Sequence, residues 1–261
     1  TIVQSESNLG FAGGNNLGFV KSRGQYVLFL NNDTVITSDF LTPMVKFLEE
    51  RSDVGIVQPK ILFHRPGTIL HHKVNSLGSF LLKSGFLYHL DYGKTDKNMK
   101  TIPYEIFTAY GACFLVRKKI IDKVGLFDES YFAYFEETDL CHRVWLAGWK
   151  IMAITNAIIY HKGAKTAQKL PTAFIQYHSF KNRIFTYLKN FDDANLVKIF
   201  IPHLLICEIS SVIYLLTGKP DYTLAIQRAI VWNFLNFNRL RKERKKVQEV
   251  IRKVDDSEFI P

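Results

Sequence analysis

The chain has 261 residues, which is enough for one large domain or for one domain followed by a C-terminal appendage. Hydrophobic residues make up 47% of the chain and aromatic residues 14%, and this composition excludes an intrinsically disordered protein. The formal net charge of +10 favours an anionic partner: a nucleic acid, an anionic membrane surface or a phosphorylated substrate. Three cysteines without the spacing of a disulfide framework or a metal site are typical of a reducing, cytosolic compartment.

The first residues are typical of the end of a strand, so we expect a further N-terminal portion to precede Thr1. A glycine-rich turn follows at residues 8–16, with the sequence Asn-Leu-Gly-Phe-Ala-Gly-Gly-Asn-Asn, and predicts a helix that runs to about Ser22. Two interpretations of this turn stay open. Its backbone N–H groups could bind an anion at the helix N-terminus, or it could be a tight turn capped by asparagines.

Residues 26–30, with the sequence Tyr-Val-Leu-Phe-Leu, predict a central parallel strand that is buried on both faces. Asn31, Asn32, Asp33 and Thr34 follow at once, at the expected carboxyl edge of the sheet. Ligands bind at this edge in open α/β sheets, so Asp33 is the first candidate for a site residue. Its carboxylate suits a divalent cation that carries a phosphate group.

Further elements follow in α/β order. The pattern predicts a helix over 37–50, a strand over 53–63, an irregular excursion over 64–105, a strand over 108–117 and a helix over 118–124. The strand at 108–117 has small residues at its centre, which usually mark the close approach of another group to the backbone.

Residues 127–143 alternate between aromatic and acidic side chains, and a helix is predicted from Glu136 to Ala147. Glu136, Glu137 and Asp139 fall in its first turn, and two interpretations stay open. The acids could be helix-terminal caps, with Asp139 and Arg143 as an i,i+4 ion pair. Alternatively, crowding beside apolar walls raises at least one carboxyl pKa, as a general base needs.

A strand is predicted over 149–154 and a second over 158–161. His161 is the last residue of the second strand, and two interpretations stay open: a structural residue or a ligand. Residues 162–183 are basic and aromatic and could receive a diphosphate or anionic headgroups. Residues 196–217 are the most apolar segment, but charged and polar residues interrupt it. With 223–237 and the basic run 239–246 it predicts an interfacial helix or a helical hairpin at a membrane, or a helix pair packed on the domain.

Taken together and in order, these segments resemble family 2 of the inverting nucleotide-sugar glycosyltransferases, in particular its rhamnosyltransferase-like bacterial branch. The resemblance covers about residues 5–165. It is carried by the turn at 8–16, by Leu-Asn-Asn-Asp-Thr at 30–34, by 111–117 and 125–129, by Glu-Glu-Thr-Asp-Leu-Cys-His-Arg at 136–143 and by Ala-Gly-Trp-Lys-Ile at 147–151. The first acid of the family's Asp-x-Asp pattern is Asn31 here, which leaves Asp33 as the carboxylate for the metal.

The resemblance implies a GT-A fold, an α/β Rossmann-like and mostly parallel sheet with helices on both faces, followed by a C-terminal helical appendage. We expect a catalytic domain over 1–170, which lacks its first strand and helix, and a basic, membrane-associated region over 171–261. The resemblance assigns Glu137 as the base and Asp33 with His161 as ligands of Mg²⁺ or Mn²⁺. It further implies donor-binding residues (Asn8, Gly10, Asn15, Asn31, Asn32) and acceptor-binding residues (Gly111, Ala112, Glu136, Asp139).

The implied activity is transfer of a sugar, with inversion, from a nucleoside-diphosphate sugar to a glycan or polyprenyl-diphosphate-linked acceptor. We expect the protein at an anionic membrane surface on the cytoplasmic side, without nucleic acid as a partner, since no nucleic-acid motif occurs. The alternative is a non-catalytic sugar- or nucleotide-binding module, because half of the donor site is expected before Thr1. A nucleotidyltransferase is disfavoured because its glycine-rich, basic pattern does not occur.

Overall fold

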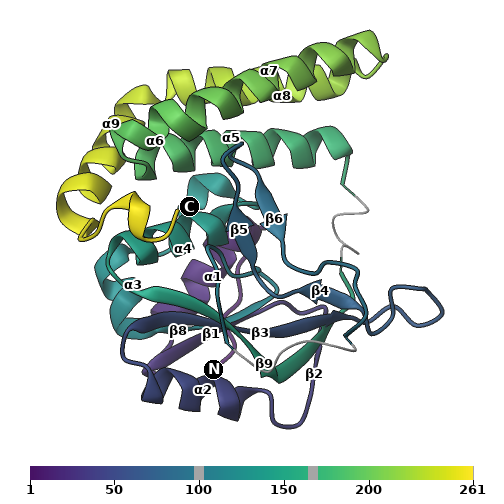
Figure 1. Ribbon diagram of the computed structural model, residues 1–261, viewed down its shortest axis with the longest axis vertical. Helices are drawn as coiled ribbons and strands as arrows, with labels where there is room; N and C mark the ends of the chain where they lie inside the picture. Colours follow the sequence, from purple (N-terminus) through teal and green to yellow (C-terminus); the bar gives the residue numbers. More distant parts are fainter. Residues whose placement is uncertain (97–102, 164–169, 261) are drawn as a thin grey trace.

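The computed structural model describes residues 1–96, 103–163 and 170–260, and within these residues seven strands form one sheet. The main path of the sheet has the order β1-β8-β3-β9-β2, with β4 paired to β3 and β7 paired to β9 (Figure 1). The seven strands are β1 (Tyr26–Leu30), β2 (Thr34–Ile36), β3 (Val54–Phe63), β4 (Val74–Ser76), β7 (Tyr104–Glu105), β8 (Cys113–Arg117) and β9 (Lys150–His161).

The α/β class is confirmed, but the sheet is mixed rather than mostly parallel. β3 and β9 are parallel, whereas β1 and β8, β8 and β3, and β2 and β9 are antiparallel. The prediction of a central parallel strand at 26–30 is therefore wrong, because β1 ends the strand order of the described sheet. Its unbroken apolar run has another cause. Val27 and Phe29 pack on one face of the sheet and Leu28 on the other, so both faces of this edge strand are covered.

Helices cover both faces of the sheet (Figure 1). Phe40, Met44 and Leu48 place α2 against one face, and the opposite face is covered by helices that share a larger apolar core. The helices of the α/β part are α1 (Gly10–Val20), α2 (Leu41–Glu50), α3 (Lys118–Val124) and α4 (Glu136–Leu146), with a short 3₁₀ turn at Glu129–Tyr131.

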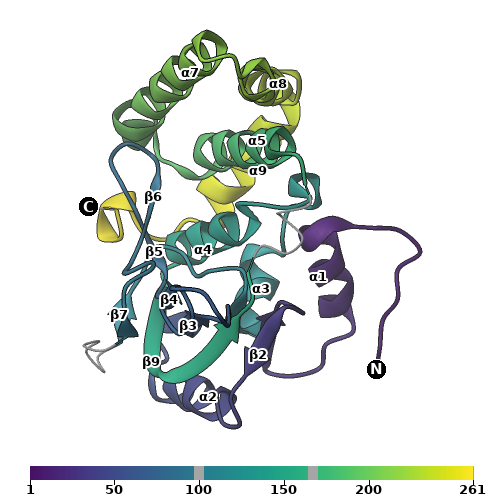
Figure 2. The same cartoon turned by 90° about the vertical axis from the view of Figure 1, so that its right-hand side faces the viewer.

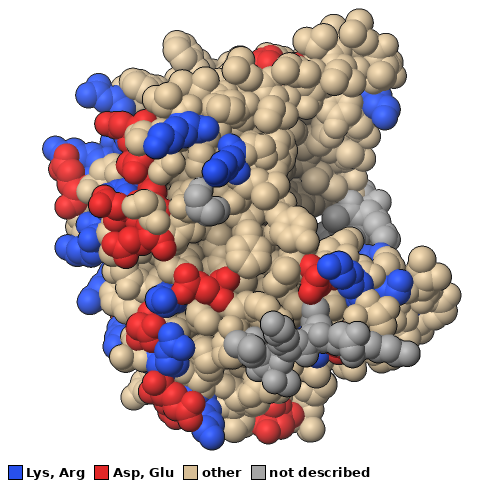
Figure 3. All heavy atoms as spheres, viewed as in Figure 1, with Lys and Arg blue, Asp and Glu red and all other residues tan. Residues whose placement is uncertain are grey.

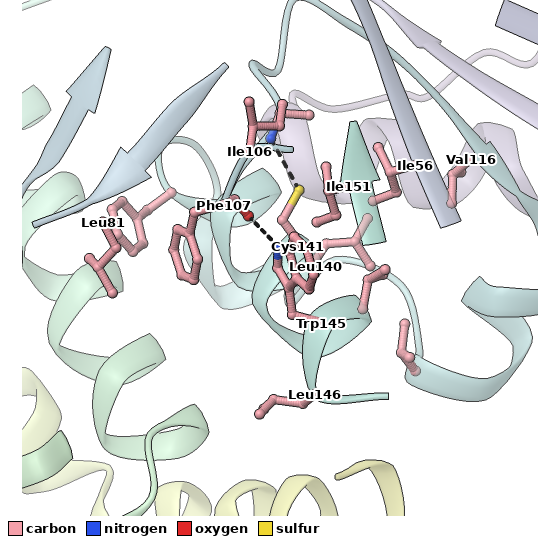
Figure 4. Close-up of a cluster of buried hydrophobic side chains, with 14 of the residues drawn as sticks. Ile56, Leu81, Ile106, Phe107, Val116, Leu140, Cys141, Trp145, Leu146 and Ile151 are labelled. Carbon is pink, nitrogen blue, oxygen red and sulfur yellow. Dashed lines mark hydrogen bonds between the residues drawn. The ribbon is translucent and has the colours of Figure 1, made fainter. Parts of the chain in front are cut away.

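The middle of α4 anchors this larger core (Figure 4). The indole N–H of Trp145 donates to the carbonyl oxygen of Phe107 at 3.0 Å, and the Ala109 N–H donates to Cys141 Sγ at 3.4 Å. Leu140 and Cys141 are fully buried against Ile151 and Ile56. The first turn of α4 is thereby held in a fixed position relative to the sheet.

From residue 172 onward the described chain is helical. Its elements are α5 (Thr172–Asn190), α6 (Asp193–Asn195), a π-helical turn (Leu196–Phe200), α7 (Ile201–Leu216), α8 (Pro220–Leu235), α9 (Phe237–Lys246), a second π-helical turn (Val247–Ile251) and a 3₁₀ turn (Asp256–Glu258). The hairpin predicted as one alternative is present, because α7 and α8 pack side by side above α5 (Figures 1 and 2).

By length and composition, one described helical stretch, Asp193–Leu216, is long and apolar enough to cross a membrane. Its mean hydropathy is 2.0, and 28% of its most apolar window is buried inside the structure. The helical part also shares the core of the sheet, since Ile184 and Tyr187 of α5 belong to the same cluster as Phe29 and Leu140. The boundary at residue 170 stays a prediction.

A two-stranded hairpin, β5 (Ser79–Leu81) and β6 (Leu87–His89), links the sheet region to the helical layer (Figure 2). The Tyr187 hydroxyl donates to the Gly85 carbonyl oxygen at 2.7 Å. His203 Nδ1 of α7 lies 2.9 Å from the Ser84 carbonyl oxygen. The hairpin tip is therefore held against both α5 and α7.

Candidate active site

Asp33 and His161 meet at one end of the sheet. Asp33 lies in the turn after β1, where the Thr34 N–H and hydroxyl both donate to the Asn31 carbonyl oxygen. His161 is the last residue of β9, which pairs with β2 so that Thr34 stands opposite His161. This register places His161 Nε2 at 3.1 Å from Asp33 Oδ1. The two residues that the sequence nominated as metal ligands are thus neighbours.

The protonation of His161 suits a metal ligand. Burial lowers the pKa of His161, and the nearby Asp33 carboxylate only partly offsets this effect. A neutral imidazole therefore prevails at pH 7 and offers one lone pair. The other ring nitrogen, Nδ1, lies 2.8 Å from Asn75 Oδ1, and a second partner of this kind fixes the ring orientation of metal-binding histidines.

The donor set fits a hard or borderline divalent cation. A carboxylate oxygen beside an imidazole nitrogen suits Mn²⁺, and a carboxylate with water suits Mg²⁺. The described residues contain no group of three or more His, Cys, Asp or Glu side chains that could hold a metal ion. A cation at Asp33 would therefore complete its shell with water and the oxygens of a diphosphate. Asn31 and Asn32 directly precede Asp33 in the same turn, and Asn32 is exposed.

Glu136 and Glu137 begin α4 directly after a strained loop. Phe132, Tyr134 and Phe135 have φ angles of 62°, 70° and 73°, in a region that residues other than glycine rarely adopt. Such strain is typical of functional sites, provided that the surroundings hold the backbone in place. Here Asn182 of α5 does so.

The Asn182 amide donates to the carbonyl oxygens of Tyr131, Ala133 and Tyr134 at 3.1, 2.9 and 2.6 Å. A single buried side chain thus fixes the loop that positions both glutamates. Sequence reasoning missed Asn182, and no local pattern could have found it, since its partners lie some fifty residues earlier in the chain.

The two glutamates differ in their proton affinity. Burial, followed by the charge of Glu137, raises the pKa of Glu136 well above its ordinary value. Burial also raises the pKa of Glu137, but the backbone N–H groups of Glu137, Thr138 and Gly111 work against it. Both carboxyl groups therefore hold a proton more tightly than a free glutamate, and the backbone N–H groups favour the charged form of Glu137. Oε2 of each residue is buried without a hydrogen-bond partner among the described residues.

The segment from Tyr110 to Ala112 connects the glutamate pair to Asp33. The Gly111 N–H bonds to Glu137, and the Ala112 carbonyl oxygen accepts a 2.9 Å bond from the Asn31 N–H. The Tyr110 ring centroid lies 5.8 Å from that of His161. Burial, followed by the charges of Glu137 and Asp33 among others, raises the pKa of Tyr110 to about 12. Tyr110, which sequence reasoning missed, therefore stands between the two halves of the site.

Asp139 has the structural role that the sequence offered as one alternative. Its Oδ2 accepts from Arg143 Nε at 3.0 Å, and its Oδ1 accepts from Lys189 Nζ at 2.7 Å and from the Asn190 amide at 2.9 Å. These two cations lower the pKa of Asp139 to about 2, against its burial. Both carboxylate oxygens are occupied, which argues against the predicted role of Asp139 in acceptor binding.

The turn at the start of α1 is capped by protein. The Phe11 and Ala12 N–H groups donate to the Phe132 carbonyl oxygen at 2.6 and 3.2 Å, and the Gly10 N–H donates to Asn8 Oδ1 at 2.9 Å. This favours the capping interpretation over an anion site at these N–H groups. The Asn15 amide donates to the Phe11 carbonyl oxygen of its own helix. Donor-binding roles for Asn8, Gly10 and Asn15 stay predictions.

The chain is similar to several known glycosyltransferases. Residues 1–125 match the family model described as glycosyl transferase family 2. The low-salt glycan biosynthesis hexosyltransferase Agl10 of Haloferax volcanii is 25% identical over 185 residues, which cover 69% of this chain and 58% of that protein. An N-acetylglucosaminyl-diphospho-decaprenol L-rhamnosyltransferase of Mycobacterium tuberculosis is 36% identical over 75 residues, or 29% of this chain and 24% of that protein.

This chain spans little more than half of the Haloferax relative, and Glu137 and His161 lie beyond the residues that match the family model. The crystal structure of GalNAc-T7 with UDP, GalNAc and Mn²⁺ superposes with a TM-score of 0.55 at 15% identity, covering 73% of this chain and 36% of that one. This likeness confirms the fold that the sequence predicted. Residues 1–125 are therefore similar to glycosyl transferase family 2, and the described chain has the GT-A fold.

Proposed function

We propose that this protein is an inverting glycosyltransferase that moves a sugar from a nucleoside-diphosphate sugar to a hydroxyl group of a lipid-linked or cell-surface glycan. The observation that carries the proposal is the buried Oε2 of Glu137, which has no hydrogen-bond partner among the residues described. A carboxylate oxygen in this state can accept a proton from an acceptor hydroxyl. The match of residues 1–125 to glycosyl transferase family 2 supports sugar transfer as the reaction.

In the proposed reaction, the acceptor oxygen attacks the anomeric carbon of the donor sugar and gives its proton to Glu137. The bond between that carbon and the diphosphate oxygen breaks, and its electron pair leaves with the diphosphate. One displacement of this kind inverts the anomeric configuration. The Gly111 N–H orients the Glu137 carboxylate, and the raised pKa of Glu136 favours a neutral group beside it.

Asp33 and His161 would hold Mg²⁺ or Mn²⁺, which acts as a Lewis acid on the departing diphosphate. The structural likeness to a transferase solved with UDP and Mn²⁺ supports the proposal that a divalent cation binds here. The 3.1 Å separation of the two side chains is close enough for both to contact one ion.

The test is transfer and hydrolysis with a panel of sugar nucleotides, with Mn²⁺ and a polyprenyl-linked acceptor. Glu137→Gln should reduce the rate by about 10²–10⁴, because that is the usual contribution of a positioned base. Asp33→Ala and His161→Ala should raise the Mn²⁺ concentration needed for half-maximal rate. Asp39→Ala is the matched control, since Asp39 is an exposed aspartate six residues beyond Asp33.

Turnover that survives Glu137→Gln unchanged would exclude the assigned base. Binding of a sugar nucleotide without turnover with any donor or acceptor would instead favour the alternative, a non-catalytic sugar- or nucleotide-binding module. Circular dichroism of each variant separates loss of chemistry from loss of folding.

We propose further that the acceptor is bound at a membrane, on its cytoplasmic face. Residues that point outward from α7 are apolar, with Leu205, Ile209 and Leu216 exposed by 60%, 59% and 80%. His203, Cys207 and Ser211 of the same helix are buried. This is the reverse of a helix that faces water, and it supports contact with lipid. The surface over α7 and α8 carries few charged side chains (Figure 3).

Two further observations support this location. α9 follows α8 in the chain and has basic residues in its last turn, which would favour an anionic membrane surface. The three cysteines are free and buried, which suits the reducing cytoplasmic side. The notion that the basic stretch after His161 receives anions rests partly on Lys165 and Lys169, which lie outside the described residues.

A further inference from the structure

Arg183 of α5 is a cation that has no acidic partner among the described residues. Its guanidinium carbon lies 4.9, 5.2 and 5.6 Å from the ring centroids of Phe86, Phe135 and Phe180. Its Nε is buried and has no hydrogen-bond partner among the described residues, and Nη2 reaches only Ser179 Oγ, at 3.4 Å. Three rings thus cover the faces of the guanidinium, while its hydrogen-bonding edge is left largely unused.

Other buried cations of the described residues have closer polar partners than Arg183. Lys181 donates to the Ser130 carbonyl oxygen at 2.5 Å. Arg143 and Lys189 both bond to Asp139. Around Arg183 the structure shows instead Tyr187 of α5, with His203 and Cys207 of α7. Burial and then the Arg183 charge lower the pKa of His203 to about 4, so this histidine is neutral. A guanidinium edge that is partly exposed and has no ion pair within the described chain is suited to an anionic ligand.

Arg183 lies between α4, which begins with the two glutamates, and the helical hairpin of α7 and α8. On one side, Phe135 immediately precedes Glu136 and Glu137 in the chain. On the other, His203 and Cys207 belong to the buried face of α7, whose outer face is apolar. The turn between β5 and β6 contributes Phe86, whose ring centroid lies 4.7 Å from that of His203. Arg183 therefore lies between carboxylates that could act on a sugar and a surface that suits hydrocarbon.

We propose that Arg183 binds the diphosphate ester of an amphiphilic acceptor, with the sugar toward Glu137 and the hydrocarbon chain along the outer face of α7. The inference rests on the proposed function and names the acceptor group that this site recognises. Arginine is suited to the task because its planar guanidinium donates two parallel hydrogen bonds to phosphate oxygens. A phospholipid headgroup offers related chemistry, so the test must separate the two sources.

The test measures binding of geranyl diphosphate to the 261-residue chain, in EDTA so that no cation at Asp33 and His161 recruits the diphosphate. Arg183→Gln should weaken binding by about ten- to a hundred-fold, since charge-assisted hydrogen bonds are lost. Arg183→Lys keeps the charge without the planar geometry and should give a smaller loss. Arg228→Gln is the matched control, because Arg228 is exposed and its guanidinium lies 5.7 Å from the Tyr177 ring centroid.

Equal affinity of Arg183→Gln and the unchanged chain would overturn the proposal. So would a loss of binding to phosphatidylglycerol vesicles as large as the loss for geranyl diphosphate, which would identify a headgroup site. In transfer assays Arg183→Lys should raise KM for the lipid-linked acceptor and leave KM for the sugar nucleotide unchanged. The binding measurement needs no turnover, so it can succeed or fail independently of the proposed reaction.

Discussion

Glu136 and Glu137 are adjacent in the chain, and burial raises the pKa of both, yet their polar surroundings differ. Glu137 accepts backbone hydrogen bonds from its own helix turn and from Gly111, whereas Glu136 is buried with the charge of Glu137 beside it. The difference comes from the turn at Gly111, which approaches one carboxylate and not the other. A Cβ at position 111 would lie 3.5 Å from Glu137 Oε1, which is an ordinary van der Waals contact.

We expect Glu136→Gln to stabilise the protein at neutral pH. The raised pKa of Glu136 means that the folded chain holds this proton more tightly than the unfolded chain. Stability from Glu136 is thus complete below its ordinary pKa of 4.5 and is lost as pH rises toward the folded value. Glutamine does not ionise, so the variant should gain roughly 1–3 kcal/mol at pH 7.5 and almost nothing at pH 4.

Urea denaturation at both pH values measures this difference. A variant that is less stable than the unchanged chain at pH 7.5 would show that Glu136 is ionised and paired in the folded protein.

At the level of single elements, the start of α1 depends on a glycine. Gly10 has φ of +69°, and a Cβ there would lie 2.3 Å from the Phe132 carbonyl oxygen. Gly10→Ala should therefore destabilise the protein by about 1–3 kcal/mol, because the turn must open or the strained loop must move. Gly14→Ala in the same helix meets nothing within 4 Å and should stabilise it by about 0.5–1 kcal/mol. Thermal unfolding compares the two variants, and equal effects would exclude the proposed clash.

Asp139 joins α4 to α5, and its removal leaves Arg143 and Lys189 buried without a carboxylate. Asp139→Ala should cost about 3–5 kcal/mol, whereas Asp122→Ala, which removes an exposed i,i+4 pair with Lys118, should cost less than about 1 kcal/mol. The pKa of Asp139 is about 2, so its contribution is present above the ordinary value of 3.8 and is lost as pH falls toward 2. Chemical denaturation measures both costs, and similar values for the two variants would contradict this role.

The sequence predicts those parts of the fold and site that depend on local pattern. The polar turn at Asp33 after the strand at 26–30, the strand end at His161, the helix at Glu136 and the helix over 118–124 follow from apolar periodicity and caps. The neighbours of each strand do not follow, because pairing depends on distant segments: β1 pairs with β8, which is more than eighty residues later. For the same reason the contacts of Asn182, Lys189 and Tyr110 could not be predicted.

For the molecule as a whole, the helical hairpin of α7 and α8 packs on the same core as α4, the helix that begins with Glu136 and Glu137. Tyr187 of α5 belongs to the same core cluster as Leu140. Its hydroxyl also donates to the Gly85 carbonyl oxygen, at the tip of the β5–β6 hairpin. α8 packs on α5, and α7 packs on α8 (Figure 2). A membrane that holds α7 would therefore hold the active site at a defined height above the lipid surface, which suits an acceptor anchored in that membrane.

Ile209→Glu should abolish sedimentation of the protein with vesicles that contain phosphatidylglycerol, since it places a charge in the middle of the apolar outer face of α7. Ile69→Glu is the matched control, because Ile69 is 83% exposed and lies on the loop between β3 and β4, outside α7 and α8. Neither side chain is buried, so both variants should keep the thermal stability of the unchanged chain. Transfer to a short-chain, water-soluble acceptor should also be retained by Ile209→Glu, because the chemistry at Glu137 does not involve α7. Retention of vesicle binding by Ile209→Glu would show that the hairpin is covered by something other than lipid.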